Sequence, residues 1–370
     1  MNNAFDLNIM GIRKIVLPLG ISFYTFHALS YVIDVYWKKV PPERNFVTFV
    51  CYVSFFPQLV AGPIVRYSDI RHSFYHRYIT RVGLRNGILR FCFGLAKKVL
   101  IANEVAKLAD YVFYLPTDEL TFFVAWLGAI AYALQIYFDF SGYSDMAIGL
   151  GLMFGFKYKE NFNFPYNALS IQEFWRKWHI SLSSWFRDYL YIPLGGSYKS
   201  RFRTQLNLII VFGLCGLWHG ANYTFIIWGL FHGFFLILER TNFGHFMKKL
   251  PKVIRHSYVL LIVTIGWVFF REDNIQSALG FIKTMFIPAG LNIDIIATCL
   301  NMILIFALVV GVILSLGFNS KIKDNLILKR NRSLITAYKQ SSNVLGILVL
   351  LISILLLSTN SYNPFLYFRF

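Results

Sequence analysis

Residues 204–238 read TQLNLIIVFGLCGLWHGANYTFIIWGLFHGFFLIL and contain no Asp, Glu, Lys or Arg. Such a stretch is apolar enough to enter a lipid bilayer. It is interrupted once, at His219-Gly220-Ala221-Asn222, where the apolar pattern gives way to glycine and polar residues. We therefore interpret it as two apolar helical arms that meet at this break.

The segments on either side of this stretch decide where its ends lie. Segments 139–203 and 240–256 are both basic, and basic loops of membrane proteins collect in the cytoplasm. A stretch between two cytoplasmic loops has to enter the membrane and return. We predict a re-entrant hairpin whose first arm, 206–218, is about 20 Å long. His219 would then lie at the apex, deep in the membrane, where non-helical backbone needs protein or a water-filled cavity around it.

The composition of the whole chain agrees with a membrane location. Of its 370 residues, 56% are hydrophobic and only 15% are charged, whereas soluble domains are about 25% charged. The formal net charge of +18 is explained by cytoplasmic loops, so we do not expect nucleic acid as a partner. The four cysteines lie in apolar stretches without metal-ligand or disulfide spacing, and we interpret them as packing residues. They are Cys51, Cys92, Cys215 and Cys299.

We predict an all-α, polytopic membrane protein with a single domain over 1–370. The first spans lie within 15–138, cytoplasmic or interfacial helices within 139–203, the hairpin at 204–238 and the last spans within 257–358. The individual spans are predicted at 15–36, 45–64, 86–103, 120–138, 257–271, 297–317 and 343–358. The loops between them alternate in charge, with basic loops at 66–85, 139–203, 240–256 and 320–339 and an acidic one at 104–119.

His219 is the first candidate for chemistry, because ionisable residues inside a membrane are rare and usually functional. The alternative is a core histidine bonded to a neighbouring carbonyl. Gly216, Gly220, Gly229 and Gly233 have the spacing that lets helices approach closely. His232 is a weaker candidate, since it lies near the cytoplasmic end of its arm and is expected to snorkel to the interface.

A second candidate segment lies upstream. Ser170 and Glu173 have the form of a capping box and predict a helix over 173–188. In a continuous helix Trp175, His179 and Ser183 share one face. The alternative is an amphipathic interfacial helix with its tryptophans at the headgroup level.

A serine-nucleophile mechanism is not supported. Ser141 and Ser144 lie near Asp139 and Asp145 but have no Gly-x-Ser-x-Gly elbow. We expect the two aspartates to form structural hydrogen bonds. The sequence also contains no phosphate-binding glycine loop and no metal-ligand spacing, so we expect no metal site.

Several of these segments together resemble the membrane-bound O-acyltransferase superfamily, and within it the alginate O-acetylation branch. The resemblance rests on SFFPQLVAGPI at 54–64, on 135–155, 173–196 and 216–233, and on the ending at 362–368. It implies a helical bundle around a central channel. It also implies that the chain lacks hydrophobic helices that precede the block beginning near Leu17 in family members.

The resemblance implies that His219 is the catalytic histidine and His179 the second functional histidine. It further implies a bacterial inner-membrane enzyme that holds no cofactor, takes acetyl groups from cytoplasmic acetyl-CoA and passes them across the membrane. A periplasmic partner with an SGNH-type acetyltransferase domain would then acetylate a polysaccharide such as alginate, or peptidoglycan. Related branches serve D-alanylation of teichoic acid.

Our mechanistic hypothesis is that neutral His219 acts as general base while His179 orients the acceptor or polarises the developing oxyanion. Cationic residues of the 139–203 region would attract the donor's phosphates, or would act only as topology signals; they are Lys157, Lys159, Lys199, Arg201 and Arg203. One alternative function is a transporter or flippase of lipid-linked sugars, which predicts a second broken hairpin that the sequence lacks. Another is a non-catalytic scaffold for periplasmic acetyltransferases.

Overall fold

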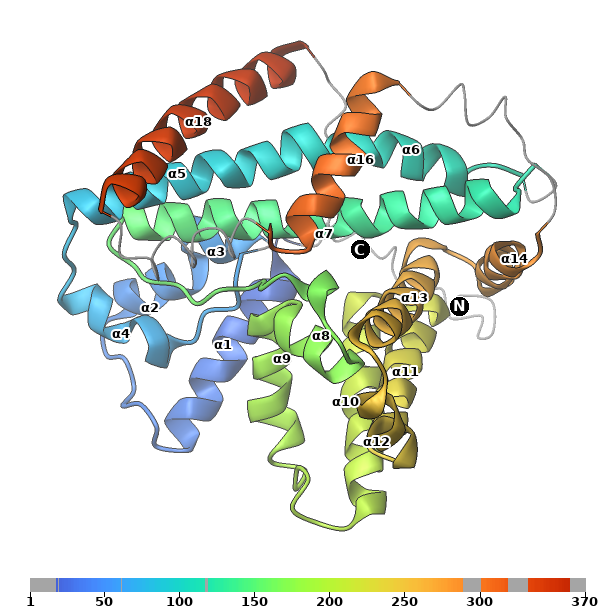
Figure 1. Cartoon of the computed structure of the whole chain (residues 1–370). Coiled ribbons are helices and arrows are strands. Elements are labelled where there is room, and N and C mark those ends of the chain that lie inside the picture. The colour runs from blue at the N-terminus through green and yellow to red at the C-terminus, as the bar shows by residue number, and fades with distance from the viewer. Residues whose placement is uncertain are drawn as a thin grey trace, which may run out of the picture.

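The structure is a computed structural model that describes residue 18 and residues 20–60, 62–116, 119–288, 301–318 and 332–359. Within these ranges every regular element is a helix (Figure 1), which confirms the predicted all-α class. Several earlier predictions lie outside the described residues: the start of the first span at 15–17, residues 297–300 with Cys299, most of the basic loop 320–339, and the ending 362–368.

The N-terminal helices are shorter than the predicted spans. They are α1 (Ile21–Tyr36), α2 (Phe46–Ser54), α3 (Phe56–Leu59) and α4 (Tyr67–Tyr75). The prediction of one span over 45–64 is wrong. The chain becomes extended at Phe55, and Pro57 stands in the first turn of α3, where a residue without an N–H is tolerated at a helix start but not in a helix interior.

The longest pair of helices lies across the molecule in Figure 1. One partner is continuous through α5 (Arg81–Ala96), η1 (Lys97–Ala102) and α6 (Asn103–Phe113), and the other is α7 (Phe122–Met153). The predicted boundaries at 103 and 138 are therefore both too early. Glycines allow this contact: a Cβ built on Gly94 would lie 2.7 Å from the carbonyl oxygen of Gly142.

The segment expected as one helix over 173–188 is broken into three parts. It forms α8 (Ile171–Lys177), α9 (Ile180–Phe186) and the π-helical turn η3 (Arg187–Tyr191), after a short 3-10 turn η2 (Pro165–Asn167). The predicted helix start is confirmed, since Ser170 accepts from the Glu173 N–H; the Glu173 carboxylate accepts from the N–H of Leu169, one residue before the N-cap. Trp175 and Trp178 are buried inside the protein and so do not face lipid headgroups.

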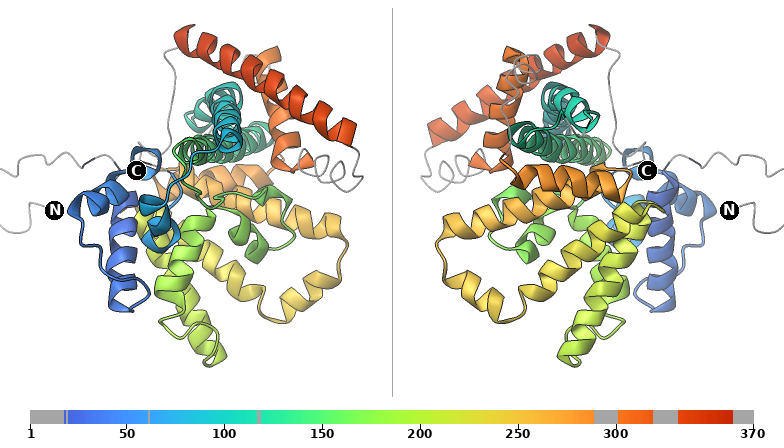
Figure 2. Two further views of the ribbon diagram at one scale, coloured as in Figure 1. Left: turned by 90° about the vertical axis from the view of Figure 1, so that its left-hand side faces the viewer. Right: turned by 90° about the vertical axis from the view of Figure 1, so that its right-hand side faces the viewer.

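The predicted hairpin is confirmed as two packed helices, α10 (Arg201–His219) and α11 (Tyr223–Leu238). The chain continues through α12 (Asn242–Lys249), α13 (Lys252–Arg271), α14 (Ile275–Phe286), α16 (Met302–Ser315) and α18 (Arg332–Thr359). Figure 2 shows the hairpin on one side of the α5–α7 pair and α18 on the other. The buried hydrophobic residues form one large cluster that includes residues of α6, α7, α13 and both arms of the hairpin.

Three described helices are long and apolar enough to cross a membrane: Phe122–Met153, Lys252–Arg271 and Ser333–Thr359. Helices α11 and α12 meet the same test as a pair bent by 75°. Among the other predicted spans, 15–36 and 45–64 correspond to shorter or broken helices, whereas 86–103 lies inside the longer α5–η1–α6 unit. Hydropathy therefore located the apolar segments but not the ends of their helices.

The first arm of the hairpin begins at Arg201, five residues earlier than expected, and ends at the predicted break. Helix α10 has 19 residues, about 28 Å at 1.5 Å per residue, so the estimate of about 20 Å for the first arm is too short. The Asn222 side-chain amide donates to the carbonyl of Asp273 over 2.6 Å. The apex is therefore level with the end of α13 that is remote from its basic start at Lys252.

Close packing of the hairpin gives a first prediction. A Cβ on Gly229 would lie 2.2 Å from the Phe212 carbonyl oxygen, so the two backbones would have to separate. Gly229→Val should destabilise the protein by about 1–3 kcal/mol, seen as a lower Tm in detergent. Gly213→Ala is the matched control, because its Cβ meets only the Leu230 side chain at 3.7 Å. An equal Tm for both variants would contradict the close packing.

Candidate active site

His219 is the last residue of α10 and is 7% exposed. Its ring is surrounded by other rings: Trp218 at 4.6 Å, Phe270 at 4.9 Å and Trp228 at 5.1 Å between centroids. These rings come from both arms of the hairpin and from α13. They exclude bulk water from the imidazole, which favours its neutral form.

His179 lies at the break between α8 and α9. Its backbone is left-handed, with φ 43° and ψ 55°, a conformation that costs energy for a residue with a Cβ and that is often retained at functional sites. The side chain is 1% exposed and packs edge-on against Phe140, with ring centroids 4.6 Å apart. The helix break thus directs His179 into the aromatic interior, which the predicted continuous helix did not anticipate.

Trp218 joins the two histidines. Its ring lies 4.6 Å from His219 and 6.5 Å from His179, and it also packs against Phe23 of α1 at 5.7 Å. The structure therefore brings together, around one indole, the two histidines that the sequence singled out. They come from segments that are 40 residues apart in the numbering (219 − 179).

His232 does not snorkel. It is completely buried, between Trp175 at 5.1 Å and Trp228 at 5.4 Å. The prediction was wrong because Gly266 of α13 leaves room for the ring: a Cβ there would lie 2.6 Å from Nε2. His232 and His219 thus both pack against the indole of Trp228. His232 lies more than one helical turn along α11 from the apex.

The aspartates near Ser141 and Ser144 form ion pairs with the α5–η1 segment. Asp139 pairs with Lys98 at 2.5 Å and Asp145 with Lys97 at 2.6 Å. Their predicted structural role is confirmed. These pairs place cations and carboxylates inside the α5–α7 contact, where an unpaired charge would be costly.

The sequence did not point to Asn161, which is fully buried beside His179. Asn161 Oδ1 lies 3.1 Å from His179 Nδ1 and accepts from Ser181 Oγ over 2.8 Å. Its nearest sequence neighbours, in the run ENFNFP at 160–165, form no motif of known chemistry. Only the turn that returns from α7 to α8 places it against the histidine.

A pocket opens beside this network. It has a volume of about 30 Å³ and is lined by Arg66, Lys157, Lys159, Ser181 and Ser184, among others. The other three cations that we considered for binding the donor's phosphates do not line this pocket; they are Lys199, Arg201 and Arg203. Ser181 connects the pocket to His179, because its hydroxyl bonds Asn161.

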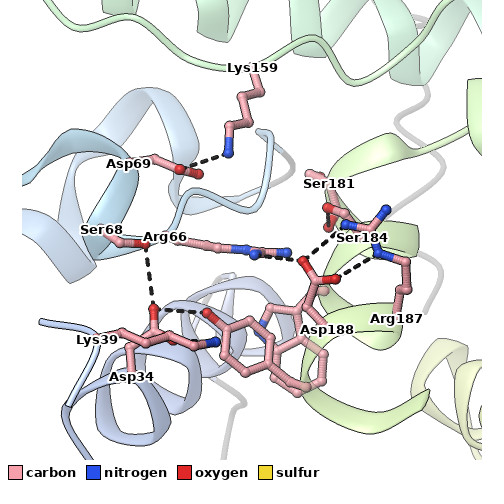
Figure 3. A network of polar contacts seen from close by, with 12 residues as sticks. Asp34, Lys39, Arg66, Ser68, Asp69, Lys159, Ser181, Ser184, Arg187 and Asp188 are labelled. Atoms are coloured by element: carbon pink, nitrogen blue, oxygen red, sulfur yellow. Dashed lines mark hydrogen bonds and ion pairs between the residues drawn. The ribbon is translucent and has the colours of Figure 1, made fainter. Parts of the chain in front are cut away.

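Ion pairs hold the cations around the pocket in place (Figure 3). Arg66 bonds Asp188 over 2.8 Å, and Lys159 bonds Asp69 over 2.7 Å. Burial opposes ionisation of Asp188, but bonds from Arg187 and Arg66 hold its pKa below the usual value. The Asp188 carboxylate is therefore charged and fixes the Arg66 guanidinium near the pocket.

Among the described residues, no group of three or more His, Cys, Asp or Glu side chains is placed to hold a metal ion. The polar groups gathered around the two histidines are imidazoles, hydroxyls and an amide within an aromatic shell. This set can move a proton and orient a hydroxyl group.

The model of the membrane-bound O-acyltransferase family matches residues 41–270, which contain both histidines. The chain belongs to the membrane-bound O-acyltransferase family. It is thus a multi-pass membrane protein of an acyltransferase family. The resemblance found in the sequence is confirmed.

Several proteins similar to this chain carry names that describe acetylation of a polysaccharide or of the cell wall. "Probable alginate O-acetylase AlgI" of Azotobacter vinelandii is 43% identical over 99% of this chain and 78% of its own length. The protein of that name from Pseudomonas aeruginosa is 50% identical over 76% of this chain and 54% of its own length. "Peptidoglycan O-acetyltransferase" of Helicobacter pylori is 42% identical, over 75% and 58%.

The chain thus spans between about half and four-fifths of the length of these curated relatives. Their names are consistent with O-acylation of a polysaccharide and give no support to a flippase or to a non-catalytic scaffold.

Proposed function

We propose that this membrane-bound O-acyltransferase moves acetyl groups from a cytoplasmic thioester across the membrane for O-acetylation of an exported or cell-wall polysaccharide. The observation that carries the proposal is the convergence of His179 and His219 on Trp218 inside a water-excluding aromatic shell. Exclusion of water favours transfer to an acceptor hydroxyl over hydrolysis of the thioester.

In the proposed reaction His219 is the general base. It takes the proton of the acceptor hydroxyl as the oxygen attacks the acetyl carbonyl, so that a C–O bond forms and the C–S bond breaks. The proton then passes from the imidazolium to the leaving thiolate, and the products are an acetyl ester and a free thiol. His219 is neutral at the start and at the end, as a buried imidazole requires.

Acetyl-CoA is the donor that we propose. Lys157 and Lys159 at the mouth of the Ser181 pocket supply positive charge for its phosphates. This assignment requires the segment that follows α7, residues 154–203, to lie on the cytoplasmic side, in agreement with its basic character. On the other side of a bacterial inner membrane, we propose that a periplasmic SGNH-type partner receives the acetyl group and completes transfer to alginate, peptidoglycan or a similar polymer.

Sealed right-side-out vesicles from native cells test the sidedness of the proposal. Radiolabelled acetyl-CoA is loaded inside, and periplasmic extract and polysaccharide are supplied outside. We expect label on the external polysaccharide only when the donor is inside. Acetyl-CoA supplied outside to sealed vesicles is the matched control, and equal labelling from that side would contradict the proposed direction of transfer.

A further inference from the structure

The side-chain amide of Asn161 has only one possible orientation. The backbone N–H of Ser181, which can only donate, points at one amide atom over 3.2 Å, so this atom is the oxygen. The other amide atom, the nitrogen, donates to Ser144 Oγ over 2.9 Å. Both ends of the amide are therefore fixed by their partners.

Asn161 also begins helix α9. Its backbone carbonyl accepts from the N–H of Ile180 over 2.9 Å, and its Oδ1 accepts from the N–H of Ser181. His179, the residue before the helix, provides no side-chain cap of its own. Asn161 supplies the acceptors that the first N–H groups of α9 need.

This orientation determines the tautomer of His179. Because Asn161 Oδ1 carries no hydrogen, His179 Nδ1 at 3.1 Å has to donate to it. A neutral imidazole has one N–H, so Nε2 carries a lone pair and can only accept. Among the described residues Nε2 is buried and has no hydrogen-bond partner. The shell around it is aromatic, with Phe140, Phe162 and Phe23 around the ring, and contains no carboxylate bonded to the imidazole.

We infer that Asn161 is a positioning residue for the acyl-transfer reaction, which it serves by holding His179 as the Nδ1–H tautomer. This inference rests on the proposed function. Of the two roles considered for His179, polarising an oxyanion needs a donor, whereas neutral Nε2 is an acceptor. His179 therefore orients the acceptor substrate by accepting a hydrogen bond from one of its O–H groups, beside the hydroxyl that His219 deprotonates.

Two replacements of Asn161 separate this role from simple capping. Asn161→Asp keeps an acceptor for both Ser181 and His179, and the Ser144 hydroxyl can rotate to donate to the carboxylate. Asn161→Leu has a similar size and removes every acceptor of the side chain. We expect Asn161→Leu to lose transfer activity by about 10²-fold, as expected when a histidine loses its orienting partner, and Asn161→Asp to stay within about tenfold of wild type.

The pH profile supplies the readout that a structural role would not change. A carboxylate against Nδ1 stabilises the imidazolium, so in Asn161→Asp the acid limb of the pH–activity profile should move to higher pH. In a His179→Gln background the same change should have no effect on the profile. Full activity of Asn161→Leu, or rescue by Asn161→Asp with an unchanged profile, would overturn the inference.

A spectroscopic measurement is independent of activity. Solid-state ¹⁵N NMR of histidine-labelled protein in liposomes reports which ring nitrogen is protonated, and the His179→Gln variant identifies the signal. We expect a protonated Nδ1 and an unprotonated Nε2 at His179 in wild type, and loss of this preference in Asn161→Leu. A protonated Nε2 in wild type would refute the tautomer, whereas the expected tautomer with no acetyl transfer in any assay would refute only the proposed function.

Discussion

Cells in which His219 is replaced by alanine are expected to lose O-acetyl groups from their surface polysaccharide down to background. A positioned general base contributes about 10²–10⁴-fold to a reaction rate. The rings packed nearest to His219 are those of Trp218, Trp228 and Phe270, and none of them is a base. The measurement is the ester-linked acetate released from the polysaccharide by mild alkali.

A matched variant shows that the loss is specific. His245 lies on α12, is exposed, and contacts only the backbone of its own turn through Nδ1, so His245→Ala should leave acetylation unchanged. Both variants should be present in membranes at wild-type levels. Normal acetylation in His219→Ala cells would contradict the assignment of the base.

The second large effect is expected for His179→Ala, which should lower the rate of acetyl transfer by about 10²-fold. In our account His179 orients the acceptor and does not take its proton, so the loss should appear in the Michaelis constant for the acceptor as well as in kcat. The thioester donor should bind as before.

Combination with His219→Ala distinguishes one catalytic unit from two separate effects. Residues that act together in one reaction give non-additive losses, so the double variant should be no slower than His219→Ala alone. Because His179 occupies a left-handed conformation at a helix junction, its alanine variant also needs a Tm within a few degrees of wild type. Losses that multiply would show that the two histidines serve different steps.

The sequence predicted those parts of the site that depend on local pattern. The break at His219-Gly220-Ala221-Asn222 predicted the hairpin, because glycine and polar residues interrupt an apolar run. The spacing of Gly216 with Gly220 and of Gly229 with Gly233 predicted close approach of its arms, and the structure shows this approach at Gly216 and Gly229.

The parts that escaped prediction depend on contacts between distant segments. The 173–188 segment has helical periodicity, yet it is interrupted before Ile180. The backbone carbonyl and the side-chain amide oxygen of Asn161 accept from the N–H groups of Ile180 and Ser181, so that a new helix begins there. The same contact places His179 in the interior and sets its tautomer. The π-helical turn that joins α5 to α6 carries Lys97 and Lys98, whose ion pairs with α7 also connect distant segments.

The most direct test of the account is the rate of acetyl transfer out of acetyl-CoA loaded into sealed right-side-out vesicles, compared between wild type and His219→Ala at equal amounts of folded protein. The account predicts labelled acetyl ester outside the wild-type vesicles, with an equal amount of free CoA thiol inside, and neither product above background for the variant. Transfer at the wild-type rate by His219→Ala would contradict it.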